Sequence, residues 1–128
     1  MDLVNRAGSA ETVVNEKNTA VAVGSGNFDV FSTPMMVALM EEAAVNAVAP
    51  ALDENQSSVG INISVDHVAA SLLGKKISAK AVVLSAEGKI VKFQVTAYEG
   101  EKLIGSGSHT RAIVGSNFVK KLLEKEIT

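Results

Sequence analysis

The acidic side chain best placed for chemistry in this 128-residue sequence is Glu41. It lies within the apolar segment 34–50, and at 100° per residue it shares a helical stripe with valines and alanines. A carboxylate on such a stripe should be paired, be hydrogen-bonded or carry a raised pKa, because burying an unpaired charge is costly. That makes Glu41 a candidate general base or nucleophile, although a structural hydrogen bond or a wet cleft explains the pattern equally well.

His67 shows a comparable anomaly on a predicted strand. It has the parity of the apolar residues in the alternating run 59–68, so it should point toward the side that the helix covers. Alone, this pattern is more typical of a core histidine bonded to the backbone. If His67 met Glu41, the two would form an acid–base pair with tunable pKa values. The alternating residues are Val59, Ile61, Ile63, Val65 and His67.

A hydroxyl group precedes the same predicted helix. Ser32 or Thr33 fits the N-cap position, and Pro34 fits the first helical position. The Thr33 hydroxyl would then lie beside free backbone N–H groups, and those of Met35 and Met36 could hold a substrate carbonyl or oxyanion.

A second histidine lies on a glycine-rich predicted strand. Gly105, Gly107, His109 and Arg111 alternate and therefore share one face, where the two glycines indicate close approach by a helix, a ligand or another backbone. Arg111 could bind a phosphate or a carboxylate there, or face solvent as an ordinary surface cation.

The pattern around these residues predicts an α+β domain. One apolar helix precedes four strands joined by tight turns, so we expect a curved antiparallel sheet wrapped around that helix. The helix is apolar nearly all round, which predicts burial on most sides. The predicted elements are short strands at Glu11–Val14 and Thr19–Val23, a helix at Pro34–Val48, strands at 59–68, Ile77–Ser85, Ile90–Tyr98 and Lys102–Val114, and a short helix capped by Ser116-Asn117.

Composition narrows the classes of protein. Residues 1–128 have the size of a single domain, and a net charge of -2 argues against non-specific nucleic-acid binding. The absence of cysteine excludes disulfides and thiolate sites, and two histidines make a metal site improbable. No signal peptide is recognisable and the apolar segment is too short and polar to span a membrane, so we expect a cytoplasmic protein.

Three segments together resemble hotdog-fold thioesterases of the fluoroacetyl-CoA thioesterase-like family. They are residues 31–41 (FSTPMMVALME), 65–71 (VDHVAAS) and 104–112 (IGSGSHTRA). The resemblance covers the chain from about Ala10 to Val114. It implies a hotdog fold, a homodimer or tetramer, and hydrolysis of a small or medium acyl-CoA thioester, with no cofactor beyond the CoA of the substrate.

The resemblance also assigns roles to residues. The family's catalytic Thr, Glu and His fall on Thr33, Glu41 and His67. Glu41 would activate water or form a transient mixed anhydride, His67 would assist proton transfer and thiolate departure, and Thr33 would orient the reacting groups. Arg111 matches a family arginine near the acyl end or the dimer contact.

The chain also departs from the fluoroacetate-specific pattern. Pro34 stands where that enzyme has glycine, and the segment before Phe28 lacks its Pro-rich lid, although Phe28 and Phe31 could still gate the pocket. We therefore expect a different acyl group.

Three other interpretations remain open at this stage. A non-catalytic module would bind acyl-CoA or another small apolar ligand, with Glu41 and His67 holding a structural hydrogen bond. An enoyl-CoA hydratase or dehydratase fits less well, because Asp66 and His67 are strand neighbours and must point to opposite faces. A cystatin-like cone shares the crude element order.

Overall fold

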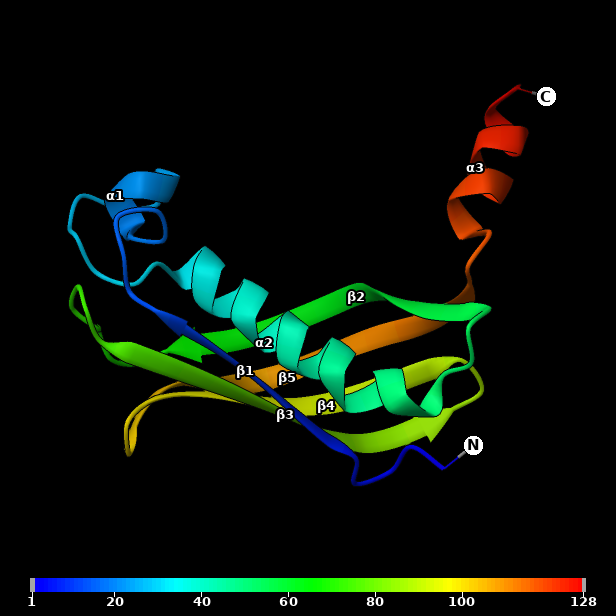
Figure 1. The fold of residues 1–128 in the computed structure, drawn as a ribbon, viewed down its shortest axis with the longest axis horizontal. Helices are drawn as coiled ribbons and strands as arrows, with labels where there is room; N and C mark the ends of the chain where they lie inside the picture. Colours follow the sequence, from blue (N-terminus) through cyan, green and yellow to red (C-terminus); the bar gives the residue numbers. More distant parts are fainter. Residues whose placement is uncertain (1, 128) are drawn as a thin grey trace.

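A single antiparallel sheet curls around one long helix, as the sequence predicts (Figure 1). The computed structural model describes residues 2–127. The strand order is β1-β3-β4-β5-β2, so β1 and β2 form the two edges of the sheet. The elements are β1 (Ala7–Val13), α1 (Ala20–Val23), α2 (Thr33–Val48), the 3-10 turn η1 (Ala49–Ala51), β2 (Gln56–His67), β3 (Lys76–Glu87), β4 (Ile90–Glu99), β5 (Lys102–Gly115) and α3 (Phe118–Ile127).

Helix α2 begins and ends where the sequence signals predict. The Ser32 side chain accepts a hydrogen bond from the Met35 N–H at 3.2 Å, Pro34 lies in the first turn, and the chain turns into η1 before Pro50. Gly8 of β1 lets the strand approach the helix closely, since a Cβ there would collide with the backbone of Ala43 and Ala47.

Burial of α2 on most sides was a wrong expectation. The helix fills the concave face of the sheet with one side and leaves the other uncovered, because a single sheet can wrap only part of a cylinder. Glu42 and Asn46 are exposed there, as their small polar stripe predicts, but Val45 is also 39% exposed. The buried residues of α2 are Met36, Leu39, Met40, Ala43, Ala44, Ala47 and Val48.

The central strands supply the other half of the core with strict alternation. Every second residue of β3 from Ile77 to Val83 and of β4 from Val91 to Ala97 is buried and faces α2, as expected for strands with one solvated face. Phe93 is the one large aromatic ring in this layer, and the remaining residues are aliphatic. These residues are Ile77, Ala79, Ala81, Val83, Val91, Phe93, Val95 and Ala97.

The N-terminal segment differs from its prediction. Strand β1 begins at Ala7 rather than Glu11, and Thr19–Val23 forms no strand. Thr19 instead caps the short helix α1 by accepting from the Ala22 N–H at 3.2 Å, and Gly24 ends it with φ of 75°. The β-branched valines of this segment predict a strand, but the Thr19 cap and the Gly24 terminus make it a short helix.

Strand β2 contains a bulge that the alternation conceals. Its register against β5 shifts between Gly60 and Asn62, so Ile61 is the extra residue. The predicted single face therefore breaks: Ile63, Val65 and His67 share the helix side with Gly60, whereas Ile61 is 53% exposed.

The C-terminal half otherwise follows the sequence. Gly88 and Gly100 have φ of 59° and 62° in the two predicted hairpin turns. Helix α3 follows β5 and stands away from the sheet (Figure 1). Within residues 2–127, no helix has the length and apolarity needed to cross a membrane.

The close contact at Gly8 should be sensitive to a single methyl group. We expect Gly8→Ala to lower the free energy of unfolding by about 1–3 kcal/mol, because the new Cβ meets helix backbone that cannot move independently. Urea unfolding measures the change. Ser9→Ala, on the exposed face of the same strand, is the control and should have little effect; equal stability of the two variants would contradict the contact.

Candidate active site

The first candidate group forms where the N-terminus of α2 meets the end of β2. Because Ser32 is the cap, the Thr33 hydroxyl is free to bond elsewhere, and its Oγ1 lies 2.8 Å from Nδ1 of His67. The expected free donors at this end are already used. The Met35 N–H donates to the Ser32 hydroxyl, and the Met36 N–H donates to the Ser32 carbonyl at 3.0 Å.

A pocket of about 310 Å³ opens beside this pair. Nε2 of His67 is buried and has no hydrogen-bond partner within residues 2–127. Burial lowers the pKa of His67 below its ordinary value, and the Ala69 carbonyl opposes this in part, so the imidazole is disposed to be neutral at pH 7. The pocket is lined by Ala20, Ser25, Val30, Phe31, Ser32, Thr33, His67, Val68, Ala69 and Ala70.

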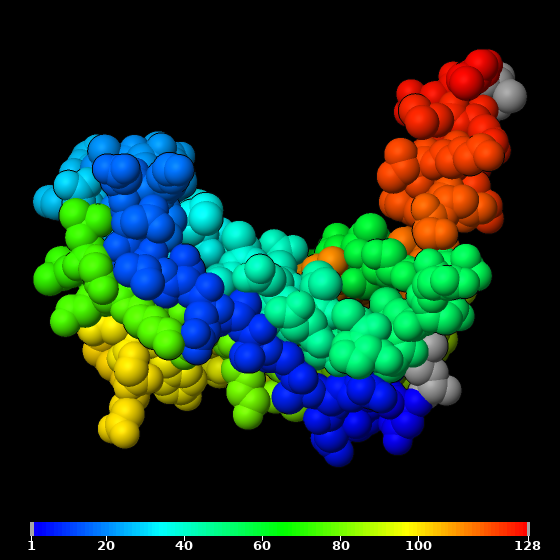
Figure 2. Space-filling view, in the orientation of Figure 1, coloured from blue at the N-terminus to red at the C-terminus, as the bar shows by residue number. Residues whose placement is uncertain are grey.

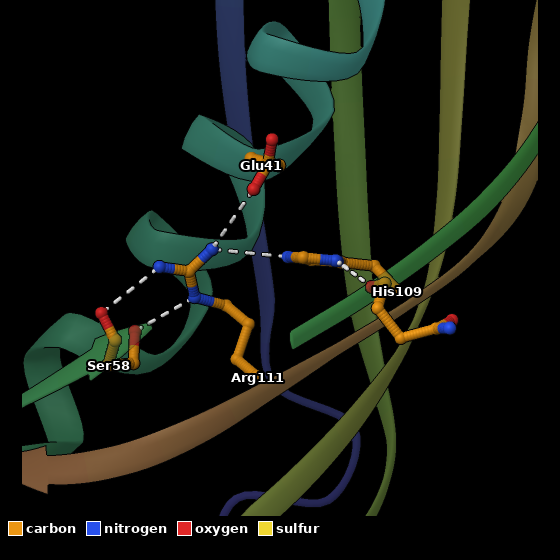
Figure 3. A network of polar contacts seen from close by, with 5 residues as sticks. Glu41, Ser58, His109 and Arg111 are labelled. Atoms are coloured by element: carbon orange, nitrogen blue, oxygen red, sulfur yellow. Dashed lines mark hydrogen bonds and ion pairs between the residues drawn. The ribbon is translucent and has the colours of Figure 1, made fainter. Parts of the chain in front are cut away.

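The second candidate group surrounds Glu41, two turns further along α2 (Figure 3). Oε2 of Glu41 lies 3.8 Å from NH1 of Arg111. Arg111 is a buried residue, with 7% of its surface exposed. Arg111 also donates to the Ser58 hydroxyl through Nε at 2.9 Å and to the Ser58 carbonyl through NH2 at 3.1 Å. The buried cation thus holds the carboxylate, whose side chain remains 40% exposed.

His109 completes this network in one defined tautomer. Its Nδ1 lies 2.7 Å from the Asn62 carbonyl, which can only accept, so Nδ1 carries the proton. Nε2 then accepts from NH1 of Arg111 at 3.1 Å. Burial lowers the pKa of His109, and the Arg111 charge lowers it further, while the Asn62 carbonyl and Glu41 raise it in part. Burial also lowers the pKa of Arg111, opposed by Glu41.

The bulge and Gly60 make room for Glu41 at the sheet edge. A Cβ on Gly60 would lie 2.9 Å from Oε2 of Glu41 and 3.3 Å from NH1 of Arg111, so a side chain there would displace the carboxylate. A second pocket, of about 330 Å³, opens at this place. It is lined by Glu41, Gly60, Ile61, Asn62, Ile63 and His109.

The two candidate groups are separate within one chain. Thr33 and Glu41 are eight residues apart on α2, about 12 Å along its axis. Gly60 and His67 lie toward opposite ends of β2. The structure therefore brings Thr33 to His67, and it brings Glu41 to Arg111 and His109 rather than to His67.

The other predicted substrate contacts are distributed unevenly. Phe31 is buried and lines the pocket beside His67, whereas Phe28 is 75% exposed. Met35 lines a different groove together with Phe31 and Glu42. Met36 is fully buried, and its Sδ would lie 2.5 Å from a Cβ on Gly105, which confirms the close approach that the strand glycines predict.

Sequence reasoning missed Gly60, Ser58 and Asn62, and it gave His109 no role in the Glu41 group. The sequence analysis places Gly60 within a regular alternating strand, although a glycine inside a strand is a signal of a bulge or a close approach. His109 shares the face of Arg111 in the predicted strand, but only the structure shows that its ring stacks on Phe93 with centroids 5.7 Å apart.

Comparison with known proteins gives a consistent result. A family model described as fluoroacetyl-CoA-specific thioesterase matches residues 14–117. A fluoroacetyl-CoA thioesterase of Streptantibioticus cattleyicolor is 42% identical over 86 residues, or 67% of this chain. The chain spans 62% of the length of that curated relative.

Solved structures match over nearly the whole chain. A mutant of the fluoroacetyl-CoA-specific thioesterase FlK in complex with fluoroacetate and CoA is 33% identical, with a TM-score of 0.83 over 93% of this chain and 99% of that one. A hot-dog-like protein from Thermanaerovibrio acidaminovorans, 22% identical, matches with a TM-score of 0.86 over 98% and 93% of the two chains. The hotdog fold that the sequence predicts is confirmed.

The lowered pKa of the half-buried His67 and of the buried His109 has a consequence for stability. Between that lowered pKa and the unfolded value of about 6.5, the unfolded chain binds more protons than the folded one, so stability should fall as pH drops through this window. Urea unfolding at several pH values measures the slope. His109→Gln should flatten it, because one titrating imidazole is lost, and Ser108→Ala should not. An unchanged slope in His109→Gln would contradict the assignment.

Proposed function

Because this chain belongs to the family of fluoroacetyl-CoA-specific thioesterases, we propose that it hydrolyses an acyl-CoA thioester to the free acid and CoA. The observation that carries the proposal is the 2.8 Å contact between the Thr33 hydroxyl and His67 beside a pocket, at positions matching the family's catalytic threonine and histidine. Glu41, the third catalytic position, is held by a buried arginine and remains partly open to solvent.

The proposed chemistry divides the work among these three side chains. Glu41 takes a proton from water, whose oxygen attacks the thioester carbonyl and forms a tetrahedral intermediate. Collapse of that intermediate breaks the C–S bond, and the proton that Glu41 took from water passes through His67 to the CoA sulfur, which restores the Glu41 carboxylate. Thr33 fixes the orientation of the imidazole through Nδ1. Direct attack by the Glu41 carboxylate, giving a mixed anhydride that water then hydrolyses, uses the same groups.

The separation of the two groups supports a homodimeric site. A hydrolytic site needs the carboxylate and the imidazole around one thioester, which one chain does not provide. Strand β2 is an edge, and antiparallel pairing with the same strand of a partner reverses its direction. We propose that this pairing sets Glu41 of one subunit beside Thr33 and His67 of the partner subunit.

The bulge fixes the register of the proposed pairing. The partner's His67 reaches Glu41 only if it lies across from Gly60, the residue that the carboxylate touches. From this match inward, with the extra residue Ile61 skipped, Asn62 lies opposite Asp66 of the other subunit and Ile63 lies opposite Val65. Ser64 therefore lies opposite its own copy on the twofold axis. Helix-facing residues then lie opposite helix-facing residues, as a continuous sheet requires.

The acyl group is proposed to differ from fluoroacetyl. Pro34 occupies the first turn beside Thr33, and the segment over the pocket is α1 with the loop that follows, whose Phe28 is largely exposed rather than buried in the pocket. A hydratase is disfavoured by Asp66, which is exposed and lies on the strand face opposite to His67.

Turnover should depend on Glu41. We expect thiol release from at least one ester in a panel of short, medium and aromatic acyl-CoA esters, and a loss of about 100-fold or more in kcat/KM for Glu41→Gln, because the general base is removed. Glu42→Gln, the exposed neighbour, is the matched control and should retain activity. Binding of the esters by calorimetry without any turnover would favour the ligand-binding interpretation instead.

A mixed dimer tests whether the site is shared. Glu41→Gln and His67→Gln chains should each be inactive alone. Unfolded and refolded together, they should recover about a quarter of wild-type activity, because half of the dimers are mixed and each mixed dimer has one intact site. No recovery, with mixed dimers present by native mass spectrometry, would show that each site is built within one chain.

A further inference from the structure

We propose that α3 is a dimerisation arm that packs its apolar face on the partner subunit, against the surface around Val68 and Leu72 at the mouth of the partner's Thr33–His67 pocket. This inference rests on the homodimer of the proposed function. It adds a second contact to the β2 edge and assigns a role to a helix that the catalytic site does not use.

Helix α3 has an apolar face that its own chain leaves uncovered. Residues 119–127 are all exposed. At 100° per residue, the apolar side chains lie on one side of the helix, on either side of Glu126, and Lys120, Lys121, Glu124 and Lys125 lie on the other side. The apolar residues are Val119 at 63% exposure, Leu122 at 47%, Leu123 at 59% and Ile127 at 83%.

The start of α3 is anchored beside the edge strand. Gly115 pairs with Gln56 at the beginning of β2, and the Ser116 N–H donates to the Asn55 carbonyl at 2.9 Å. From this anchor the helix rises away from the sheet and spans about 15 Å over its ten residues (Figure 1). It therefore reaches into the space that a subunit paired on β2 would occupy.

The molecular surface has the shape of a saddle on that side. Figure 2 shows α3 at one end, the α1 segment at the other, and a hollow between them over α2 and β2. A twofold axis through Ser64 exchanges the two ends of such a saddle. Each α3 then lies against the opposite end of the partner, which is the self-complementary arrangement of an isologous dimer.

The receiving end carries exposed apolar side chains of its own. In the proposed register, Gln56 lies beyond the partner's His67, beside the segment 68–72 that follows β2, so α3 begins near that segment. Leu72 is 63% exposed, and it joins the pocket wall through its bridge to Val30. Val68 and Phe28 nearby are 60% and 75% exposed. Packing α3 on this surface would bury apolar area from both subunits and close one side of the pocket to water.

Engineered disulfides test the contact in the full-length chain, which has no cysteine of its own. Chains carrying Leu122→Cys are mixed with chains carrying Leu72→Cys, refolded together and oxidised gently. We expect a disulfide-linked mixed dimer on a non-reducing gel. Lys121→Cys, on the opposite side of α3, is the matched control and should give at least tenfold less product with Leu72→Cys.

A second variant measures what the contact contributes. The double substitution Leu122→Glu and Leu123→Glu should raise the dimer dissociation constant at least tenfold in sedimentation equilibrium, whereas Lys121→Glu should not. A circular dichroism spectrum of each variant shows that the sheet is intact. Equal cross-linking from both sides of α3, or an unchanged dissociation constant, would overturn the proposal.

Two further outcomes separate this inference from the proposed function. If Ser64→Cys forms a covalent dimer and thioester turnover persists, but α3 does not cross-link to Leu72, the arm is wrong while the shared site stands. If light scattering shows a tetramer that the glutamate variant converts to dimers, α3 joins two dimers and does not pack on the partner subunit of its own dimer, which overturns the inference. A monomer that hydrolyses acyl-CoA would overturn the α3 arm and the shared site, while the proposed thioesterase activity would stand.

Discussion

The geometry of this protein's edge strand depends on keeping one buried guanidinium satisfied. Arg111 is nearly inaccessible, so its N–H groups need acceptors: Ser58 and His109 accept three hydrogen bonds, and Glu41 forms an ion pair with NH1. Arg111 donates to Nε2 of His109, whose Nδ1 donates to the Asn62 carbonyl, so His109 has one neutral tautomer. The arginine also holds Glu41 at the edge of the sheet. Gly60 and the bulge beside it leave space for that carboxylate. Only the arginine of this ion pair is buried, since the Glu41 side chain is 40% exposed, so the pair is weak evidence for stability.

The same constraint explains why Glu41 and the Thr33–His67 pair lie apart within one chain. Glu41 is tied to the middle of α2 by Arg111, whereas Thr33 and His67 meet at the first turn of the helix. A hydrophobic helix cannot shift along its sheet to bring them together, because Gly8 and Gly105 fit its backbone and Met36 closely. The remaining way to assemble carboxylate and imidazole is to use the unpaired edge of β2, which must be covered in any case.

The fold could be predicted largely from residue periodicity, but the site could not. The alternation of β3 and β4, the proline in the first turn of α2 and the hairpin glycines each determine local geometry, and each was interpreted correctly. The alternating pattern concealed the bulge at Ile61, for which Gly60 is the only local signal, and the Thr19 hydroxyl caps a helix where the pattern predicts a strand. The partner of Glu41 depends on long-range register, which no local spacing encodes.

In the proposed homodimer, with Glu41 on one subunit and Thr33 and His67 on the partner subunit, catalytic activity depends on dimer formation. If neither chain holds a complete site, the population of active centres follows the dimer equilibrium, and any contact that binds only the dimer raises that population by mass action. The β2 edge alone offers backbone hydrogen bonds and the apolar side chains of Ile61, Ile63 and Val65, between the small or polar residues Gly60, Ser64 and Asp66. An additional apolar contact from α3 would therefore have its greatest effect at low protein concentration, where the edge pairing is weakest.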